Sequence, residues 1–412
     1  MDRRKIGHEQ MQRLTTGYWR FLSVLALLLA VPGVVRADQA TIVSVEIDGP
    51  GWFGSETEVS IKMSAPAAMR AFTVSDPARV IIDLEQAAFA ADAVGDGAGV
   101  VGAAQAGWFT TETSRLVLLL DEPAEIAAVA QSIADDHAMA VISLSPVSAM
   151  AFALQPAPPA DWARAPPAAP PLRSDKPLIV LDPGHGGIDP GAVRDGVTEK
   201  DIALAFAADL AQALKSSGQF DVALTREADV YLGLRRRVEL AREWDADVFL
   251  SLHANTVTEG VARGTALYTL SDEASDEAAA NLAARENAAD LFEAASITSE
   301  SAVTRVLLDL AHRETTQRSD DLARTLLPSL RETVGVIRSR PHRSAGFAVL
   351  KAPDVPSVLI ELGFLSDAQD RENMQSPEWR QNAAAGIVKG LEAWAARDER
   401  LSAALQTVTI ED

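Results

Sequence analysis

Three ionisable side chains, His185, His253 and Glu361, each follow a short apolar run in the sequence. The runs are LIVL, VFLSL and VLI, and the first of them leads to His185 through the glycine-rich stretch DPGHGG. Bare apolar runs of this length are typical of strands covered on both faces. Because ligand sites in open α/β sheets form outside the carboxyl ends of the strands, we expect the three side chains to converge on one edge.

A fourth ionisable residue, Glu199, belongs to the helix that is expected after the His185 loop. Thr198 and Asp201 in the stretch TEKD have the spacing of a capping box, which places Glu199 in the first helical turn. The chain has no cysteine, so any metal must be held by His, Asp and Glu. Two imidazoles and a carboxylate around an open position match hydrolytic zinc sites, where water takes the fourth place. A strand-end histidine is also common as a hydrogen-bonded structural residue, and spacing alone leaves both interpretations open.

The elements that must position these residues alternate between strand and helix. Apolar periodicity and turn residues predict helices over 201–215, 232–244 and 380–394, with strands over 221–225, 248–252 and 357–360. This order indicates a C-terminal α/β domain, residues 178–397, with a mostly parallel twisted sheet flanked by helices. A C-terminal tail, residues 398–412, follows it.

The N-terminal part has a different pattern. Residues 38–148 contain short alternating β-type runs separated by Gly, Pro and Asp, which predicts a small all-β sandwich. Residues 149–177 are rich in Pro and Ala, as expected for a stiff, extended linker. The sequence therefore predicts two domains joined by a linker.

Residues 1–37 read as a signal peptide. A basic stretch precedes an apolar run of 11 residues, Phe21–Val31, and small residues stand at the −3 and −1 positions for cleavage after Ala37. The apolar run is short for a spanning helix, which needs about 20 residues, and no later run is long enough, so we expect no transmembrane anchor after cleavage. Arg3 and Arg4 leave the Sec and twin-arginine routes both open.

The charge of the chain limits its partners. Lys and Arg total 37 against 58 Asp and Glu, a formal net charge of −21, which becomes −25 once residues 1–37 are removed. Such a surface repels the phosphates of nucleic acids and anionic lipids. We therefore expect an acidic, exported protein with no nucleic-acid partner.

The motifs around the four candidate residues resemble a known enzyme family. The stretches LDPGHGG, EKDI, TR, ADVFLSLHAN and VLIELGF occur in the order found in the zinc-dependent N-acetylmuramoyl-L-alanine amidases, over about residues 178–395. The resemblance implies that His185, Glu199 and His253 bind Zn²⁺ and that Glu361 is the catalytic carboxylate. It also implies hydrolysis of the amide between N-acetylmuramic acid and L-alanine of the peptidoglycan stem peptide.

The N-terminal module has a resemblance of its own. The stretch SDPARVIIDL is similar to the core motif of the AMIN domain, which directs periplasmic amidases to peptidoglycan at the division site. The resemblance implies a periplasmic enzyme that acts in cell separation, with peptidoglycan as substrate and a LytM-domain activator as partner.

An insertion of about residues 271–318 interrupts the α/β pattern, far longer than a usual connection of about 2–6 residues. Its helix-forming stretch AAANLAARENAADLF resembles the regulatory helix of division-associated amidases. The resemblance implies that Glu286 occupies the open zinc position and blocks substrate. The alternative is that Glu286 lies on a solvated helix face.

Two other functions remain to be weighed against a zinc amidase. One is a non-catalytic peptidoglycan-binding scaffold at the septum, which would gain nothing from an open zinc site. The other is a zinc peptidase that cuts bonds within the stem peptide by the same metal chemistry.

Overall fold

The N-terminal domain consists of two facing β-sheets. The computed structural model describes residues 39–51, 55–75, 77–134, 136–159, 170–257, 262–288 and 302–408, so the signal peptide predicted at 1–37 lies outside the described residues. The first sheet has the order β5 (Ala87–Phe89), β1 (Ala40–Asp48), β2 (Thr57–Met63), β9 (Ala138–Pro146), β8 (Ala124–Ile133). The second has the order β3 (Met69–Val74), β4 (Arg79–Glu85), β7 (Thr113–Leu120), β6 (Val101–Trp108).

Alternating side chains from both sheets share one core. On β2, Val59, Ile61 and Met63 are buried while the residues between them are partly or fully exposed. They belong to one apolar cluster with Ile82 of β4 and Leu116 of β7. The predicted all-β sandwich is confirmed, and a short helix, α1 (Ala149–Ala153), follows it.

The C-terminal domain is built on a six-stranded sheet. Its order is β13 (Asp221–Leu224), β10 (Leu178–Pro183), β14 (Val248–His253), β17 (Ser357–Glu361), β15 (Ala266–Leu270), β16 (His342–Ala345). The first four strands are mutually parallel, whereas β15 runs antiparallel to β17 and parallel to β16. The mostly parallel sheet predicted for this domain is confirmed. The carboxyl ends of β10, β14 and β17 therefore meet at one edge.

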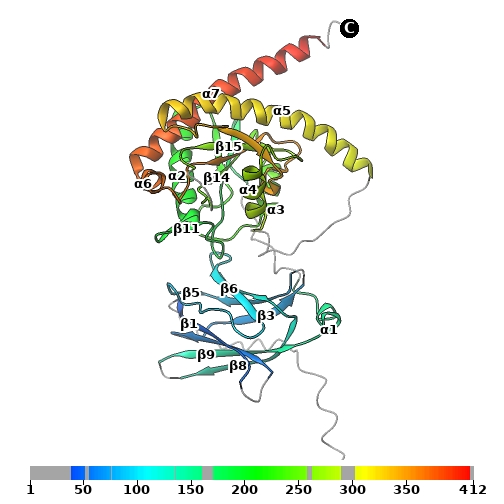
Figure 1. The fold of residues 1–412 in the computed structure, drawn as a ribbon. Helices are drawn as coiled ribbons and strands as arrows, with labels where there is room; N and C mark the ends of the chain where they lie inside the picture. The colour runs from blue at the N-terminus through cyan, green and yellow to red at the C-terminus, as the bar shows by residue number, and fades with distance from the viewer. Residues whose placement is uncertain are drawn as a thin grey trace, which may run out of the picture. The chain divides into compact units, whose positions relative to one another are not determined.

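Helices cover both faces of this sheet (Figure 1). One face packs against α2 (Glu199–Ser217), α5 (Ala302–Thr333) and α7 (Pro377–Val408). The other face packs against α3 (Leu234–Glu243), α4 (Glu277–Asn287) and the short 3-10 helix η2 (Ala348–Leu350). A two-stranded ribbon, β11 (Val193–Arg194) and β12 (Val197–Thr198), precedes α2, and α6 (Ala368–Gln375) precedes α7.

Two helices, α2 and α7, are longer than the sequence pattern predicts, whereas α3 is shorter than the predicted 232–244. α7 spans 32 residues and continues to Val408, through most of the predicted tail. α2 begins at Glu199, with Thr198 as its N-cap, but the Thr198 hydroxyl donates to Asp201 instead of capping the backbone. Within the described ranges, no helix combines the length and apolarity needed to cross a membrane.

Candidate metal centre

Four ligand-type side chains meet at the carboxyl edge of the sheet. His185, Glu199, His253 and Glu286 are all buried, and one ligand atom from each lies within 4.8 Å of the other three. Oε1 of Glu199 is 3.2 Å from Nε2 of His185 and 3.0 Å from Nδ1 of His253. Oε2 of Glu286 is 3.4 Å and 3.1 Å from the same two nitrogens. Tetrahedral zinc with bonds of about 2.0–2.1 Å needs about 3.3 Å between its ligand atoms. The four nitrogen–oxygen separations, 3.0–3.4 Å, match such an ion.

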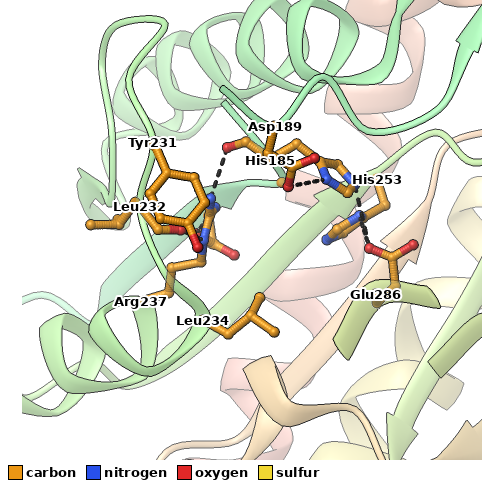
Figure 2. A pocket seen from close by; sticks show the side chains of 10 residues that line it. His185, Asp189, Tyr231, Leu232, Leu234, Arg237, His253 and Glu286 are labelled. Carbon is orange, nitrogen blue, oxygen red and sulfur yellow. Dashed lines mark hydrogen bonds and ion pairs between the residues drawn. The ribbon is translucent and has the colours of Figure 1, made fainter. Parts of the chain in front are cut away.

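The loop after β10 holds His185 in an uncommon backbone conformation. His185 has a φ of +57°, in the left-handed region that side chains other than glycine rarely adopt. Two buried arginines hold the loop through its carbonyl groups. Arg226 donates to the carbonyls of Pro183 and Gly184, and Arg237 donates to those of Pro183 and His185. The strained loop is therefore fixed by side chains from outside it, and Figure 2 shows Arg237 beside this loop.

A buried carboxylate, Asp182, holds Arg237 in place and so contributes to the support of the His185 loop. Asp182 forms an ion pair of 2.9 Å with Arg237 and accepts hydrogen bonds from the hydroxyls of Thr225 and Ser251. Burial raises the pKa of Asp182, but the charge of Arg237 and these hydrogen bonds outweigh it and lower the pKa overall. Asp182 is therefore a stable anion that orients Arg237.

Each candidate ligand has an orienting partner. Nδ1 of His185 is 2.8 Å from Oδ2 of Asp189, an arrangement that fixes the imidazole and turns Nε2 toward the centre. Nε2 of His253 is 3.2 Å from the Ser251 hydroxyl, which leaves Nδ1 for the centre. Glu199 accepts hydrogen bonds from the backbone of Ala192 and Ala254. Among the described residues, Nε2 of His185 is a buried atom without a hydrogen-bond partner, as expected for a metal ligand.

Two glycines make room for this close approach. A Cβ atom on Gly184 would lie 2.5 Å from Cε1 of His253. A Cβ on Gly191, whose φ is +64°, would lie 2.6 Å from Cδ2 of His185 and 2.8 Å from Cβ of Glu199. Any larger residue at either position would push a ligand out of place.

Glu361 lies beside the four ligand-type residues. It is the register partner of His253 on the neighbouring parallel strand, so the two side chains leave the same face of the sheet. Oε2 accepts a hydrogen bond of 3.0 Å from the backbone of Asn255, whereas Oε1 is buried without a hydrogen-bond partner in the described part of the chain. Burial, aided by the charge of Glu199, raises the pKa of Glu361 to about 8. A carboxyl group with this pKa can accept and release a proton near neutral pH.

The pKa values of Glu286 and His253 each depend on the charge of the other group. Burial by itself raises the pKa of Glu286, but His253 and His185 outweigh it and hold the pKa at about 2. Burial by itself lowers the pKa of His253, but Glu286 and Glu199 outweigh it and raise the pKa to about 10. The carboxylates of Glu199 and Glu286 are buried against the same two imidazoles, so they require compensating positive charge. Protons on the imidazoles or a metal cation can supply this charge.

Glu286 extends from helix α4 into the site, and two asparagines, Asn255 and Asn287, hold it there. Figure 2 shows Glu286 extending from α4 toward His253. Its other oxygen, Oε1, accepts a hydrogen bond from the side-chain amide of Asn255. The next residue, Asn287, donates to the carbonyl of Gly346 and accepts from the backbone of Ala348, both at 2.8 Å. Glu286 is 4% exposed, so the alternative of a solvated helix face is wrong.

The structure thus brings the five residues singled out in the sequence to one edge of the sheet. The sequence did not indicate Asp189, the support from Arg226 and Arg237, or the contact of Asn287 with the loop before η2. Asp189 follows His185 by four residues, which is a weak signal by itself. The other contacts join segments far apart in the chain, so no local pattern reveals them.

Comparisons with known proteins agree with this arrangement. The family model described as N-acetylmuramoyl-L-alanine amidase matches residues 179–393, and the AMIN domain model matches residues 52–142. The amidase AmiC of Escherichia coli O6:H1 is 30% identical over 393 residues, covering 89% of this chain and 92% of that protein. AmiC of Neisseria meningitidis serogroup B is also 30% identical, covering 95% and 97%. AmiA of Escherichia coli K12 is 37% identical, covering 52% and 75%. The chain therefore belongs to the N-acetylmuramoyl-L-alanine amidase family and carries an N-terminal AMIN domain.

Proposed function

We propose that this peptidoglycan amidase is zinc-dependent and exported, and that its own Glu286 keeps it inactive until an activator displaces α4. The observation that carries the proposal is the close group of ligand atoms from His185, Glu199, His253 and Glu286. The bond cut is the amide that joins the lactyl group of N-acetylmuramic acid to L-alanine of the stem peptide.

Three residues hold the ion, and their own partners keep them in place. His185 and His253 provide neutral nitrogens, and Glu199 provides a carboxylate oxygen from the first turn of α2. When bound, zinc supplies a Lewis acid for the scissile carbonyl and lowers the pKa of water to about 7. The backbone donors on Glu199 and the carboxylate of Asp189 on His185 limit the rotation of these ligands.

Glu361 handles the proton. It takes a proton from the attacking water and delivers it to the nitrogen of the leaving L-alanine. Its buried, unpaired Oε1 is the atom available for this transfer, while the backbone of Asn255 fixes Oε2. The raised pKa of Glu361 supports this role, because the carboxyl group must both accept and release the proton.

Glu286 acts as the inhibitor. Catalytic zinc sites keep one position open for water, whereas sites with four protein ligands are closed. With Glu286 present, four side chains converge on the ion position, and no ligand position remains for water or substrate. Activity therefore requires α4 to move.

The AMIN domain and the predicted signal peptide support a proposal for where the enzyme acts, and the family resemblance supports one for its partner. The AMIN match, together with the predicted signal peptide, supports periplasmic work on peptidoglycan during cell division. By the family resemblance, the activator is a LytM-domain protein that displaces α4.

The proposal is tested by dye release from labelled peptidoglycan sacculi, using the full-length mature protein. We expect activity to disappear with chelator and to return with zinc, and mass spectrometry to find fragments cut between N-acetylmuramic acid and L-alanine. Glu286→Ala should raise the basal rate, whereas Glu277→Ala, an exposed residue of the same helix, should not. Activity that resists complete metal removal would contradict zinc dependence, fragments cut within the stem peptide would indicate a peptidase, and an unchanged Glu286→Ala rate would contradict inhibition.

A further inference from the structure

The carboxylate of Glu286 is held at both of its oxygens. Oε2 faces the imidazole nitrogens of His185 and His253, and Oε1 accepts a hydrogen bond from Nδ2 of Asn255. The orientation of the Asn255 amide is fixed independently, because its Oδ1 accepts a hydrogen bond of 2.6 Å from the backbone of Thr256. Asn255 therefore presents a buried N–H donor to the position that Glu286 occupies.

Asn255 also contacts the proposed proton carrier. Its backbone N–H donates to Oε2 of Glu361 at 3.0 Å, and the residue is 5% exposed. The same residue thus links Glu361, which handles the proton, with the carboxylate that blocks the site. Shaping the loop needs only the bond of Oδ1 to Thr256, whereas the Nδ2 donor is directed at the carboxylate of Glu286.

The blocking group has the chemistry of the reaction product. In the hydrolysis, the water oxygen bonds to the carbonyl carbon, and the carbon–nitrogen bond breaks with its electron pair going to nitrogen. Both protons of the water end on nitrogen, so the products are the lactyl carboxylate of N-acetylmuramic acid and the ammonium group of L-alanine. The reacting carbon therefore ends with two oxygens on it, as in the side chain of Glu286. A product carboxylate in this position would have one oxygen facing the two imidazoles and the other facing Asn255.

We propose that the Asn255 side-chain amide is a catalytic hydrogen-bond donor to the substrate oxygen that faces away from His185 and His253, and that Glu286 inhibits as a product mimic by taking over this donor. The inference rests on the proposed function, since it requires Glu286 to leave before substrate enters. When Glu286 leaves, Nδ2 of this buried side chain loses its acceptor, and the substrate oxygen replaces it. A fixed donor at an oxygen that gains negative charge stabilises the transition state more than the bound substrate.

The experiment removes the donor in a protein that is already released from inhibition. Steady-state rates on soluble peptidoglycan fragments are measured for the zinc-loaded mature chain carrying Glu286→Ala, alone and combined with Asn255→Ala. Loss of one such donor costs about 10²- to 10³-fold in kcat, so we expect a fall of this size with KM changed less than about threefold. Zinc content, determined by elemental analysis, should stay at one ion per chain. Asn281→Ala, an exposed asparagine of α4, is the matched control and should leave kcat unchanged.

A binding measurement separates recognition of the product from turnover. Calorimetric titration of the Glu286→Ala protein with N-acetylmuramic acid, which carries the free lactyl carboxylate, should give binding that Asn255→Ala weakens about tenfold or more, as expected for a lost hydrogen bond to a charged group. Wild-type protein should bind this probe least, because Glu286 competes for the position.

The outcomes distinguish this inference from the proposed function. If Glu286→Ala is active and adding Asn255→Ala changes neither kcat nor probe binding, the role of Asn255 is overturned while the amidase proposal stands. If zinc-loaded Glu286→Ala hydrolyses no peptidoglycan, the proposed function fails and this inference fails with it. Should Asn255→Ala not fold or not hold zinc, Asn255→Ser provides the same comparison. Loss of zinc in both variants would make Asn255 a structural residue and overturn the proposal.

Discussion

Replacing Asn287 should allow α4 to move Glu286 out of the site without changing any ligand-type residue. Its side-chain amide donates to the carbonyl of Gly346 and accepts from the backbone N–H of Ala348, both at 2.8 Å. These bonds join the end of α4, one residue after Glu286, to Gly346 and to the first residue of η2. The substitution Asn287→Ala removes both bonds and changes none of the candidate ligand residues.

The size of the effect follows from these two bonds. A net contribution of about 0.5–1.5 kcal/mol per hydrogen bond gives about 1–3 kcal/mol for the pair. A change of this size shifts an equilibrium about 5- to 150-fold. The ratio of open to closed α4 should therefore rise by this factor, and the basal rate of peptidoglycan hydrolysis should rise with it. The rate of Glu286→Ala sets the upper limit.

Two measurements check this expectation. Dye release from labelled sacculi gives the basal rate, and hydrogen exchange of α4 amides reports the opening of the helix directly. Asn281→Ala is the control, because it makes the same substitution at an exposed position of the same helix. If Glu286→Ala raises the rate but Asn287→Ala accelerates neither hydrolysis nor exchange, the two hydrogen bonds do not hold α4 closed, and the reasoning is refuted.

Three further expectations concern the ion and its support. Glu361→Gln should retain zinc by elemental analysis but lose about 10²- to 10⁴-fold in kcat, and an active Gln variant would exclude Glu361 as the proton carrier. Asp189→Asn should weaken zinc affinity about 10- to 100-fold in a chelator competition, because His185 loses its orienting carboxylate; unchanged affinity would contradict this. Because the pKa of Asp182 is lowered in the folded chain, its stabilisation is complete well above its usual pKa of 3.8 and is lost as pH falls below that value. The difference in urea unfolding free energy between wild type and Asp182→Asn should therefore shrink from pH 7 to pH 3, and a constant difference would argue against an ionised Asp182.

The sequence predicts the convergence of these side chains well because a general rule of the fold links strand ends to one edge. His185, His253 and Glu361 each end or follow an apolar run, and parallel strands bring their carboxyl ends together. Glu199 follows from the position of α2 after the His185 loop. Apolar runs and the capping-box spacing therefore locate four of the five residues, while the amidase roles come from the family resemblance.

What the sequence does not predict depends on contacts between distant segments. Asn287 interacts with Gly346 and Ala348, 59 and 61 positions later, and Asn255 interacts with Glu286 inside the insertion. Asparagine has no fixed position in a helical or strand pattern, so neither contact leaves a periodic signal. Helix ends were also misjudged, since α7 extends beyond the predicted 380–394 on both sides.

The place of Glu286 within its helix has a consequence for how firmly the protein would retain the proposed zinc ion. Glu286 lies one residue before the end of α4, where the negative end of the helix dipole disfavours a carboxylate. The closed position of α4 is therefore stabilised by the positive charge that lies opposite Glu286. When α4 is closed, Glu286 in turn acts as one more ligand of the ion that carries this charge. Because coupling between two binding events is reciprocal, whatever draws α4 away must loosen the hold on the ion by the same factor. On the proposed function, an activated molecule is therefore also the one most exposed to losing its zinc when the metal is scarce.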